Sequence, residues 1–99
     1  MPVPLNQPPM FLPGEVVATA AVDELGLPLE VFADLVARHV HGDWGNVDAE
    51  DAAANEAALQ AGDRVLSAYD VAAPGGSVRL LVQTESDRKL TTIMLLDDL

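Results

Sequence analysis

The sequence predicts an α+β fold, with two to three helices packed on one face of a small antiparallel sheet of three or four strands. Apolar residues recur at helical spacing over 28–41, and the alanine-rich segment 49–61 is composed of strong helix formers. Three strand-like runs with short links then follow at 64–71, 78–84 and 90–96. These patterns predict an α-helical half followed by a C-terminal β-meander.

The first part of the chain divides into a tail and an edge strand. Five of the seven prolines lie among the first 13 residues, so we expect residues 1–9 to form a disordered or extended tail and residues 10–99 to form one domain. The β-branched run 15–19 predicts a short strand that joins an edge of the sheet. Thr19 is then placed to cap a brief helix over 20–25.

The helix expected over 28–41 has two different faces. Its apolar stripe comprises Leu29, Phe32, Leu35, Val36, His39 and Val40. Its polar face comprises Glu30, Asp34, Arg38 and His41. The spacing predicts an i,i+4 ion pair between Asp34 and Arg38.

The segment His41-Gly-Asp-Trp-Gly45 lies between this helix and the next. Asp48 is a good N-cap for a helix over 49–61, whose alanine face we expect to pack closely on a neighbour. Asp43 fits an Asx-type turn. Trp44 fits a plug between the helices and the sheet, with its indole N–H on a carbonyl. The alternative role for Trp44 is a partly exposed anchor at a protein interface.

The two polar links in the second half are predicted as turns. Residues 72–77, Ala-Ala-Pro-Gly-Gly-Ser, read as a hairpin loop, and residues 85–89 read as a polar turn between the last two strands. Short links of this kind join neighbouring antiparallel strands.

Composition and charge narrow the class of partner. The chain lacks cysteine, which excludes disulfides, thiolate nucleophiles and Cys-ligated zinc and fits a cytoplasmic protein. The net charge is −11, and residues 23–63 account for −9 of it whereas residues 64–99 account for −1. Such a field opposes direct nucleic-acid binding and favours a basic protein surface or mimicry of nucleic acid. The alternative is that the charge serves solubility alone. No apolar run approaches the roughly 18–20 residues of a membrane helix.

A metal or cofactor site is not predicted. His39 and His41 face about 200° apart on a helix, and no third ligand follows at a recognisable spacing. His39 is expected at the edge of the core, hydrogen-bonded to backbone, and His41 is expected to face solvent.

A small set of polar residues could nevertheless form an enzyme site. The candidate catalytic residues are His39, Asp43, Arg64, Tyr69, Glu85 and Arg88. His39 or Glu85 would act as base, and Arg64 or Arg88 would bind an anion. The alternative is that these residues have no catalytic role. The charged side chains of the turns are then solvated, and Arg64 pairs with acids of the preceding helix. No nucleophile elbow, phosphate-binding loop or zinc-protease motif accompanies them.

Several spaced motifs resemble those of a known group of proteins. They are Arg38-His-x-x-Gly-Asp-Trp-Gly45, Asp48-x-Glu-Asp-x-x-Ala-Asn-Glu56, Arg64-x-Leu-Ser-Ala-Tyr69 and Thr84-Glu-x-Asp-Arg-x-x-Thr-Thr-Ile93. In this order they are similar to a family of small proteins of plasmids, prophages and integrative elements. These are often labelled "plasmid-related protein" or "type I restriction endonuclease subunit M". The resemblance spans residues 10–96 and implies a mobile-element protein. A methyltransferase role is excluded, because 99 residues cannot hold its cofactor domain.

The chain departs from this family at two places. Related chains tend to have Trp where this one has Leu80-Leu81, and they tend to end in an acidic-aromatic tail where this one has Asp97-Asp98-Leu99. A contact made through those aromatic residues is therefore not expected here.

Charge and resemblance together predict a non-enzymatic accessory protein that binds a protein partner with a basic surface. Nucleic-acid mimicry in anti-restriction or anti-CRISPR defence is one form of this hypothesis. The expected partner-binding residues are Asp43, Trp44, Asp48, Glu50, Asp51 and Glu56. The alternative is a small nucleotide- or nucleic-acid-processing enzyme. A third hypothesis is a homodimer formed through an unpaired sheet edge.

Overall fold

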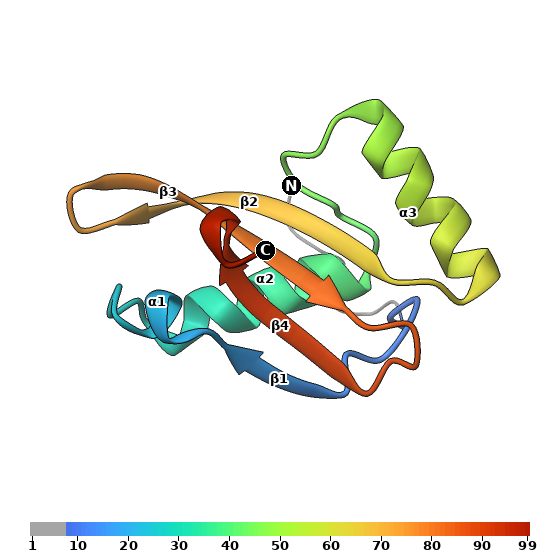
Figure 1. The fold of residues 1–99 in the computed structure, drawn as a ribbon, viewed down its shortest axis with the longest axis horizontal. Coiled ribbons are helices and arrows are strands. Elements are labelled where there is room, and N and C mark those ends of the chain that lie inside the picture. The colour runs from blue at the N-terminus through green and yellow to red at the C-terminus, as the bar shows by residue number, and fades with distance from the viewer. Residues whose placement is uncertain (1–7) are drawn as a thin grey trace.

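A computed structural model describes residues 8–99 and confirms the α+β class (Figure 1). The expectation for residues 1–9 falls mostly on residues 1–7, which lie outside the described residues. In chain order the elements are β1 (Glu15–Ala18), α1 (Ala20–Asp23), α2 (Leu29–Val40), α3 (Ala49–Ala61), β2 (Val65–Ala73), β3 (Gly76–Thr84), β4 (Leu90–Leu95) and the 3-10 helix η1 (Leu96–Asp98). In this part of the chain no helix is both long and apolar enough to cross a membrane.

The four strands form a mixed sheet in the order β1-β4-β3-β2. β2, β3 and β4 make the expected antiparallel meander. β1 runs parallel to β4, with Glu15 beside Leu90 and Ala18 beside Ile93. The prediction of a purely antiparallel sheet was therefore wrong. All three α-helices lie between β1 and β2 in the sequence, so no hairpin constrains the direction of β1.

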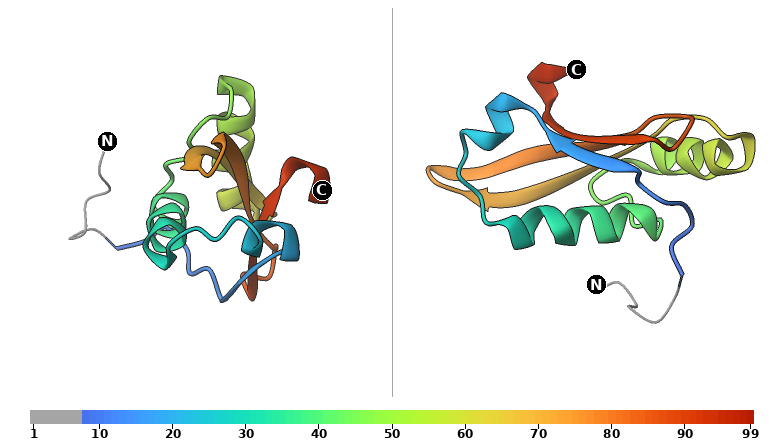
Figure 2. Two further views of the ribbon diagram at one scale, coloured as in Figure 1. Left: turned by 90° about the vertical axis from the view of Figure 1, so that its left-hand side faces the viewer. Right: turned by 90° about the horizontal axis from the view of Figure 1, so that it is seen from below.

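The two faces of the sheet are covered differently. The first face packs against α2, where Leu35 joins Tyr69, Leu80, Val82 and Ile93 in the main core (Figure 2). The second face carries a smaller cluster of Ala68, Leu81 and Met94. It is covered by the short η1 segment rather than by a long helix (Figure 2).

α3 does not share the face that α2 covers, but lies alongside the outer edge of β2 (Figure 1). Asn55 on α3 donates to the backbone oxygen of Leu66 at 2.8 Å and accepts from the Leu66 N–H at 3.1 Å. Ala52 and Ala58 face inward, but the other alanines of the helix are exposed. The prediction of a closely packed alanine face is therefore correct for one narrow strip only.

The β2–β3 hairpin is tighter than the loop predicted over 72–77. Ala73 pairs with Gly76, which leaves Pro74-Gly75 as a two-residue turn. Proline is favoured at the first central position of a type II turn, and Gly75 takes the positive φ, 88°, that the second position requires.

We predict that Asn55→Ala destabilises the fold by about 1–3 kcal/mol, because it leaves two partly buried backbone groups of Leu66 without their partners. Urea unfolding at neutral pH measures the change. Gln60→Ala, on an exposed position of the same helix, is the matched control and should lie within about 0.5 kcal/mol of wild type. Equal effects of the two variants would contradict this role of Asn55.

Candidate functional site

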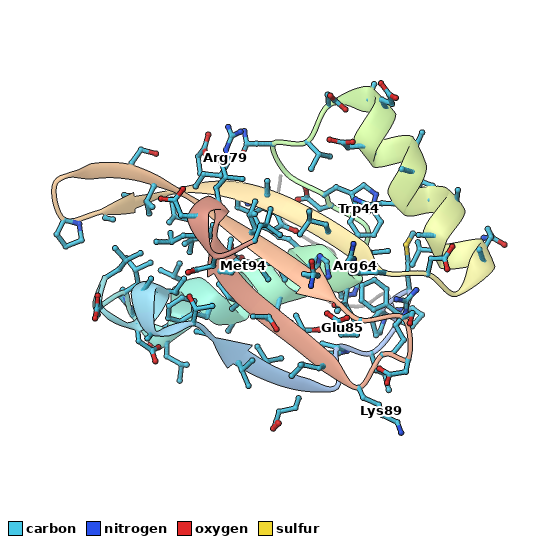
Figure 3. All side chains as sticks on the ribbon, in the orientation of Figure 1. Trp44, Arg64, Arg79, Glu85, Lys89 and Met94 are labelled. Atoms are coloured by element: carbon cyan, nitrogen blue, oxygen red, sulfur yellow. The ribbon has the colours of Figure 1, made fainter. Side chains whose placement is uncertain are left out.

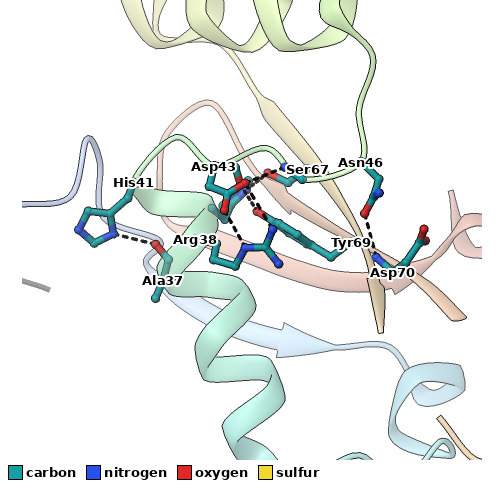
Figure 4. A network of polar contacts seen from close by, with 10 residues as sticks. Ala37, Arg38, His41, Asp43, Asn46, Ser67, Tyr69 and Asp70 are labelled. Carbon is teal, nitrogen blue, oxygen red and sulfur yellow. Dashed lines mark hydrogen bonds and ion pairs between the residues drawn. The ribbon is translucent and has the colours of Figure 1, made fainter. Parts of the chain in front are cut away.

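The segment 43–46, here called the elbow, reverses the chain after α2. The backbone N–H of Asp43 donates to the Arg38 carbonyl at 2.9 Å, and the Asp43 carboxylate forms an ion pair with the Arg38 Nε at 2.8 Å (Figure 4). The Gly45 N–H donates to Asp43 Oδ1 at 3.1 Å, which confirms the Asx-type turn. Arg38 pairs with Asp43 instead of Asp34, so the predicted i,i+4 pair was wrong. The elbow is thus tied to the helix that precedes it.

The elbow also binds β2 as a short parallel strand would. The Ala68 N–H donates to the Trp44 carbonyl at 3.1 Å, and the Asn46 N–H donates to the Ala68 carbonyl at 2.6 Å. The Asn46 side chain then accepts from the Asp70 N–H at 3.1 Å (Figure 4). The elbow and Asn55 of α3 together satisfy the outward backbone groups of β2 from Leu66 to the Asp70 N–H. This role of Asn46 was not predicted from the sequence.

Close contact between elbow and strand requires glycine at position 45. Gly45 has φ of +73°, and a Cβ there would lie 2.1 Å from the Ala68 carbonyl oxygen. It would also lie 2.5 Å from the ring of Tyr69. Neither backbone nor buried ring can move away cheaply, so any side chain at this position displaces the elbow from β2.

Trp44 anchors the elbow from inside. Its side chain is only 6% exposed and packs with Ala58 and Val65. Its indole N–H donates to the Glu56 carboxylate at 2.8 Å rather than to a carbonyl. The position is the predicted plug between α3 and the sheet (Figure 3). Trp44 cannot serve as an exposed anchor for a partner, so that alternative was wrong.

His39 lies at the centre of a buried chain of hydroxyl groups. Its Nδ1 lies 2.5 Å from Ser67 Oγ, and its Nε2 lies 2.9 Å from Thr84 Oγ1. Thr84 Oγ1 is 2.6 Å from Thr91 Oγ1, and Thr91 donates to the Pro13 carbonyl at 2.7 Å. The four side chains have no exposed surface. We predicted His39 at the edge of the core, with a hydrogen bond to backbone. It is instead fully buried and hydrogen-bonded to side chains.

The hydrogen bond from Thr91 to the Pro13 carbonyl determines which nitrogen of His39 carries a proton. Because Thr91 gives its proton to a carbonyl, Thr84 must donate to Thr91 and must accept from Nε2–H. The hydrogen bonds of the threonines thus place a proton on Nε2 of His39. Burial, with a smaller contribution from the charge of Arg88, lowers the pKa of His39 to about 4. The ring is therefore neutral at neutral pH, and its Nδ1 accepts from Ser67. The rings of Phe11 and Trp44 contact the imidazole edge-on at 5.3 and 5.8 Å and seal it from water.

Tyr69 joins the first face of the sheet to the elbow. Its hydroxyl donates to the Asp43 carbonyl at 2.6 Å, and the Arg38 guanidinium lies over its ring at 4.7 Å (Figure 4). Burial raises the pKa of Tyr69, so the phenol stays a neutral donor. Partial burial raises the pKa of Asp43, but the hydrogen bonds from Arg38 and Gly45 outweigh it, and the net pKa is lowered. The ion pair is therefore maintained.

The candidate catalytic residues do not form one exposed group. His39 and Tyr69 are fully buried, and Asp43 is occupied by Arg38. Arg64 is exposed before β2, and Glu85 follows β3. Among the described residues, neither Arg64 nor Glu85 makes a hydrogen bond or ion pair with His39, Asp43 or Tyr69, and Arg64 forms no ion pair with the preceding helix. The fold thus buries the acid–base candidates and separates them from these charged candidates.

Arg88, the remaining candidate, belongs to the β3–β4 turn. Its guanidinium donates to the Glu85 carbonyl at 3.1 Å and lies 5.2 Å from the centre of the Phe11 ring. It therefore covers the ring that seals His39 and holds the turn, and it reaches the buried histidine only through its electric field.

The two histidines do not share a ligand. His41 Nδ1 lies 2.7 Å from the Ala37 carbonyl, and the residue is half-buried rather than fully solvent-facing. Within residues 8–99, no group of three or more His, Asp or Glu side chains is placed to hold a metal ion.

The predicted partner-binding acids fall into two groups. Asp43 is occupied by Arg38, whereas Asp48, Glu50, Asp51 and Glu56 are exposed. Asp48 accepts from the Asp51 N–H at 2.8 Å, which confirms its N-cap role. The two ion pairs found in the described part of the chain are Arg38–Asp43 and Arg79–Asp70, so neither involves a carboxylate of α3.

A surface groove of about 350 Å³ begins beside the N-terminus of α3. Its charged lining residues are Asp48, Asp51 and Arg79, and Leu66 and Leu81 of the second sheet face contribute to its apolar lining. Leu96 and Leu99, which are 64% and 65% exposed, line it as well. The groove thus combines unpaired carboxylates with exposed apolar side chains.

Comparisons of the chain with protein-family models, curated proteins and solved structures found no match.

We predict that Gly45→Ala destabilises the protein by at least about 3 kcal/mol, because strain and a backbone clash act together. Thermal unfolding followed by circular dichroism measures this change. Gly62→Ala is the matched control: its φ is +74°, but a Cβ there would meet nothing within 4 Å. If both variants lost the same stability, the contact of the elbow with β2 would not be the cause.

We predict that protonation of His39 destabilises the fold in acid. The folded pKa of about 4 lies below the ordinary value of 6.5, so between these values only the unfolded chain binds the proton. The contribution is complete above about pH 6.5 and is lost as the pH falls towards 4, a loss of about 3 kcal/mol. Urea unfolding at several pH values measures it.

His41→Gln should retain this pH dependence, and His39→Gln should lose it. Long-range ¹H–¹⁵N NMR of the wild-type imidazoles provides a second readout, with the proton expected on Nε2 of His39. A histidine signal at position 39 that titrates near pH 6.5 would contradict the assignment.

Proposed function

We propose that this protein is a non-catalytic accessory protein of a mobile genetic element and binds a protein partner with a basic surface. The observation that carries the proposal is the groove beside α3, which is lined by Asp48 and Asp51 and by the exposed leucines Leu96 and Leu99. Apolar contact surrounded by charge is the usual composition of a protein interface. A partner with basic residues around an apolar patch matches this surface.

The exposed charge of α3 and the hydrogen bonds that hold this helix in place both favour this surface as the binding site. Glu50, Asp51 and Glu56 are exposed, and none of them belongs to an ion pair among the described residues. The helix that carries them is held by Asn55 and by the hydrogen bond from Trp44 to Glu56. Because the helix is fixed before a partner arrives, little conformational entropy is lost on binding.

Nucleic-acid mimicry is the specific form of partner binding that we propose. A rigid helix with uncompensated carboxylates can occupy a basic channel that otherwise holds phosphates. The mobile-element resemblance suggests restriction and CRISPR effectors as the basic partners. In this proposal the protein competes with DNA and catalyses no reaction.

Displacement of labelled duplex DNA from purified type I restriction and CRISPR effector complexes, followed by fluorescence anisotropy, tests the proposal. We predict that the wild-type protein displaces DNA from at least one complex. The variant Glu50→Gln/Asp51→Asn/Glu56→Gln should require at least about tenfold more protein, because lost interfacial charge pairs cost about 1.4 kcal/mol or more in total. The amide oxygen introduced by Glu56→Gln can still accept the Trp44 N–H.

The control is Glu24→Gln/Glu30→Gln/Asp34→Asn, which removes the same charge from exposed positions that do not line the groove. It should displace DNA within about twofold of wild type. The proposal fails if wild type displaces DNA from none of the effectors, or if the two triple variants behave alike.

A further inference from the structure

The outer edge of β1 is the open edge of the sheet. The N–H groups of Glu15 and Thr19 donate to the Lys89 and Ile93 carbonyls of the β4 side, both at 3.0 Å. Because backbone groups alternate along a strand, those of Val16 and Ala18 point away from β4. In residues 8–99 no hydrogen bond satisfies them, whereas the elbow and Asn55 cover the equivalent groups of β2.

An apolar groove runs directly beside this edge. It has a volume of about 570 Å³ and lies between β1 and α2. Its lining is uncharged and consists of Val16, Leu29, Phe32, Ala33, Val36 and Ala37. Leu29 is 79% exposed and Val16 is 42% exposed. Exposed backbone groups beside exposed apolar side chains are the two features that strand addition uses.

We propose that a second copy of this chain occupies the β1 edge, giving a two-fold symmetric dimer with a continuous eight-stranded sheet. An axis through Val17 pairs Val16 of each copy with Ala18 of the other in antiparallel register. Each such pair exchanges two backbone hydrogen bonds, so all four outward N–H groups gain acceptors. The α2 helices then lie on the same face, and Leu29 and Phe32 of both copies close the groove.

The distribution of charge fits this pairing. In this register Glu15 lies opposite Thr19 of the second copy rather than opposite another acid. Lys89, at the turn beside the start of β1, extends past the β1 edge (Figure 3). The two-fold axis brings this end towards α1 of the second copy, which carries Asp23 and the adjacent Glu24. Because the groove is uncharged and opposite charges meet at the two ends of the interface, a chain of net charge −11 can associate with itself.

Sedimentation equilibrium of the full chain from about 1 µM to about 500 µM tests the proposal, with a reversible monomer–dimer equilibrium expected in this range. Val16→Pro removes an outward donor but spares the N–H groups that bind β4, because these belong to Glu15, Val17 and Thr19. It should weaken the dimer at least about tenfold while the far-ultraviolet circular dichroism stays native.

Leu29→Ser tests the groove without touching the sheet, because this side chain is almost wholly exposed in the monomer. It should also weaken the dimer at least about tenfold. Leu96→Ser, on η1, is the matched exposed-leucine control and should leave dimerisation unchanged. The proposal is overturned if folded wild-type protein stays monomeric throughout, which would leave the edge for a strand of another protein. It is equally overturned if Leu29→Ser dimerises like wild type.

Discussion

The structure depends on how the outward backbone groups of β2 are satisfied. An edge strand with free peptide groups is prone to pair with other chains. Here the elbow supplies two main-chain bonds to Ala68, Asn46 supplies a side-chain acceptor to Asp70, and Asn55 supplies both partners of Leu66. Since these groups come from the α2–α3 connection and from α3, closing the edge also fixes where α3 lies.

This constraint explains why the most distinctive sequence motif is structural. The ion pair of Asp43 with Arg38, the hydrogen bond of Trp44 to Glu56 and the absence of a side chain at Gly45 all hold the elbow against β2. Beneath it, His39 connects Ser67 to Thr84 and is sealed from solvent. His39, Asp43 and Tyr69, which resemble catalytic groups, are therefore committed to the fold, whereas the carboxylates of Glu50, Asp51 and Glu56 stay exposed.

Local patterns predicted most elements, but not the contacts between distant segments. The caps at Thr19 and Asp48, the meander and the Asx-type turn follow from neighbouring residues, and the structure has them. The direction of β1, the position of α3 and the hydroxyl chain through His39 depend on residues tens of positions apart, which a single sequence does not relate. Arg38 had two acids within reach, and the turn at Gly42, not helical spacing, brought Asp43 to it.

One edge of this sheet is closed by groups of its own chain, and the other edge is open. Amide hydrogen exchange measured by NMR, with the protein dilute enough to be monomeric, tests it most directly. We expect slow exchange at Leu66, Ala68 and Asp70, comparable with the central strands, and fast exchange at Val16 and Ala18. Fast exchange at Leu66 and Ala68, at the rate of exposed loops, would contradict it.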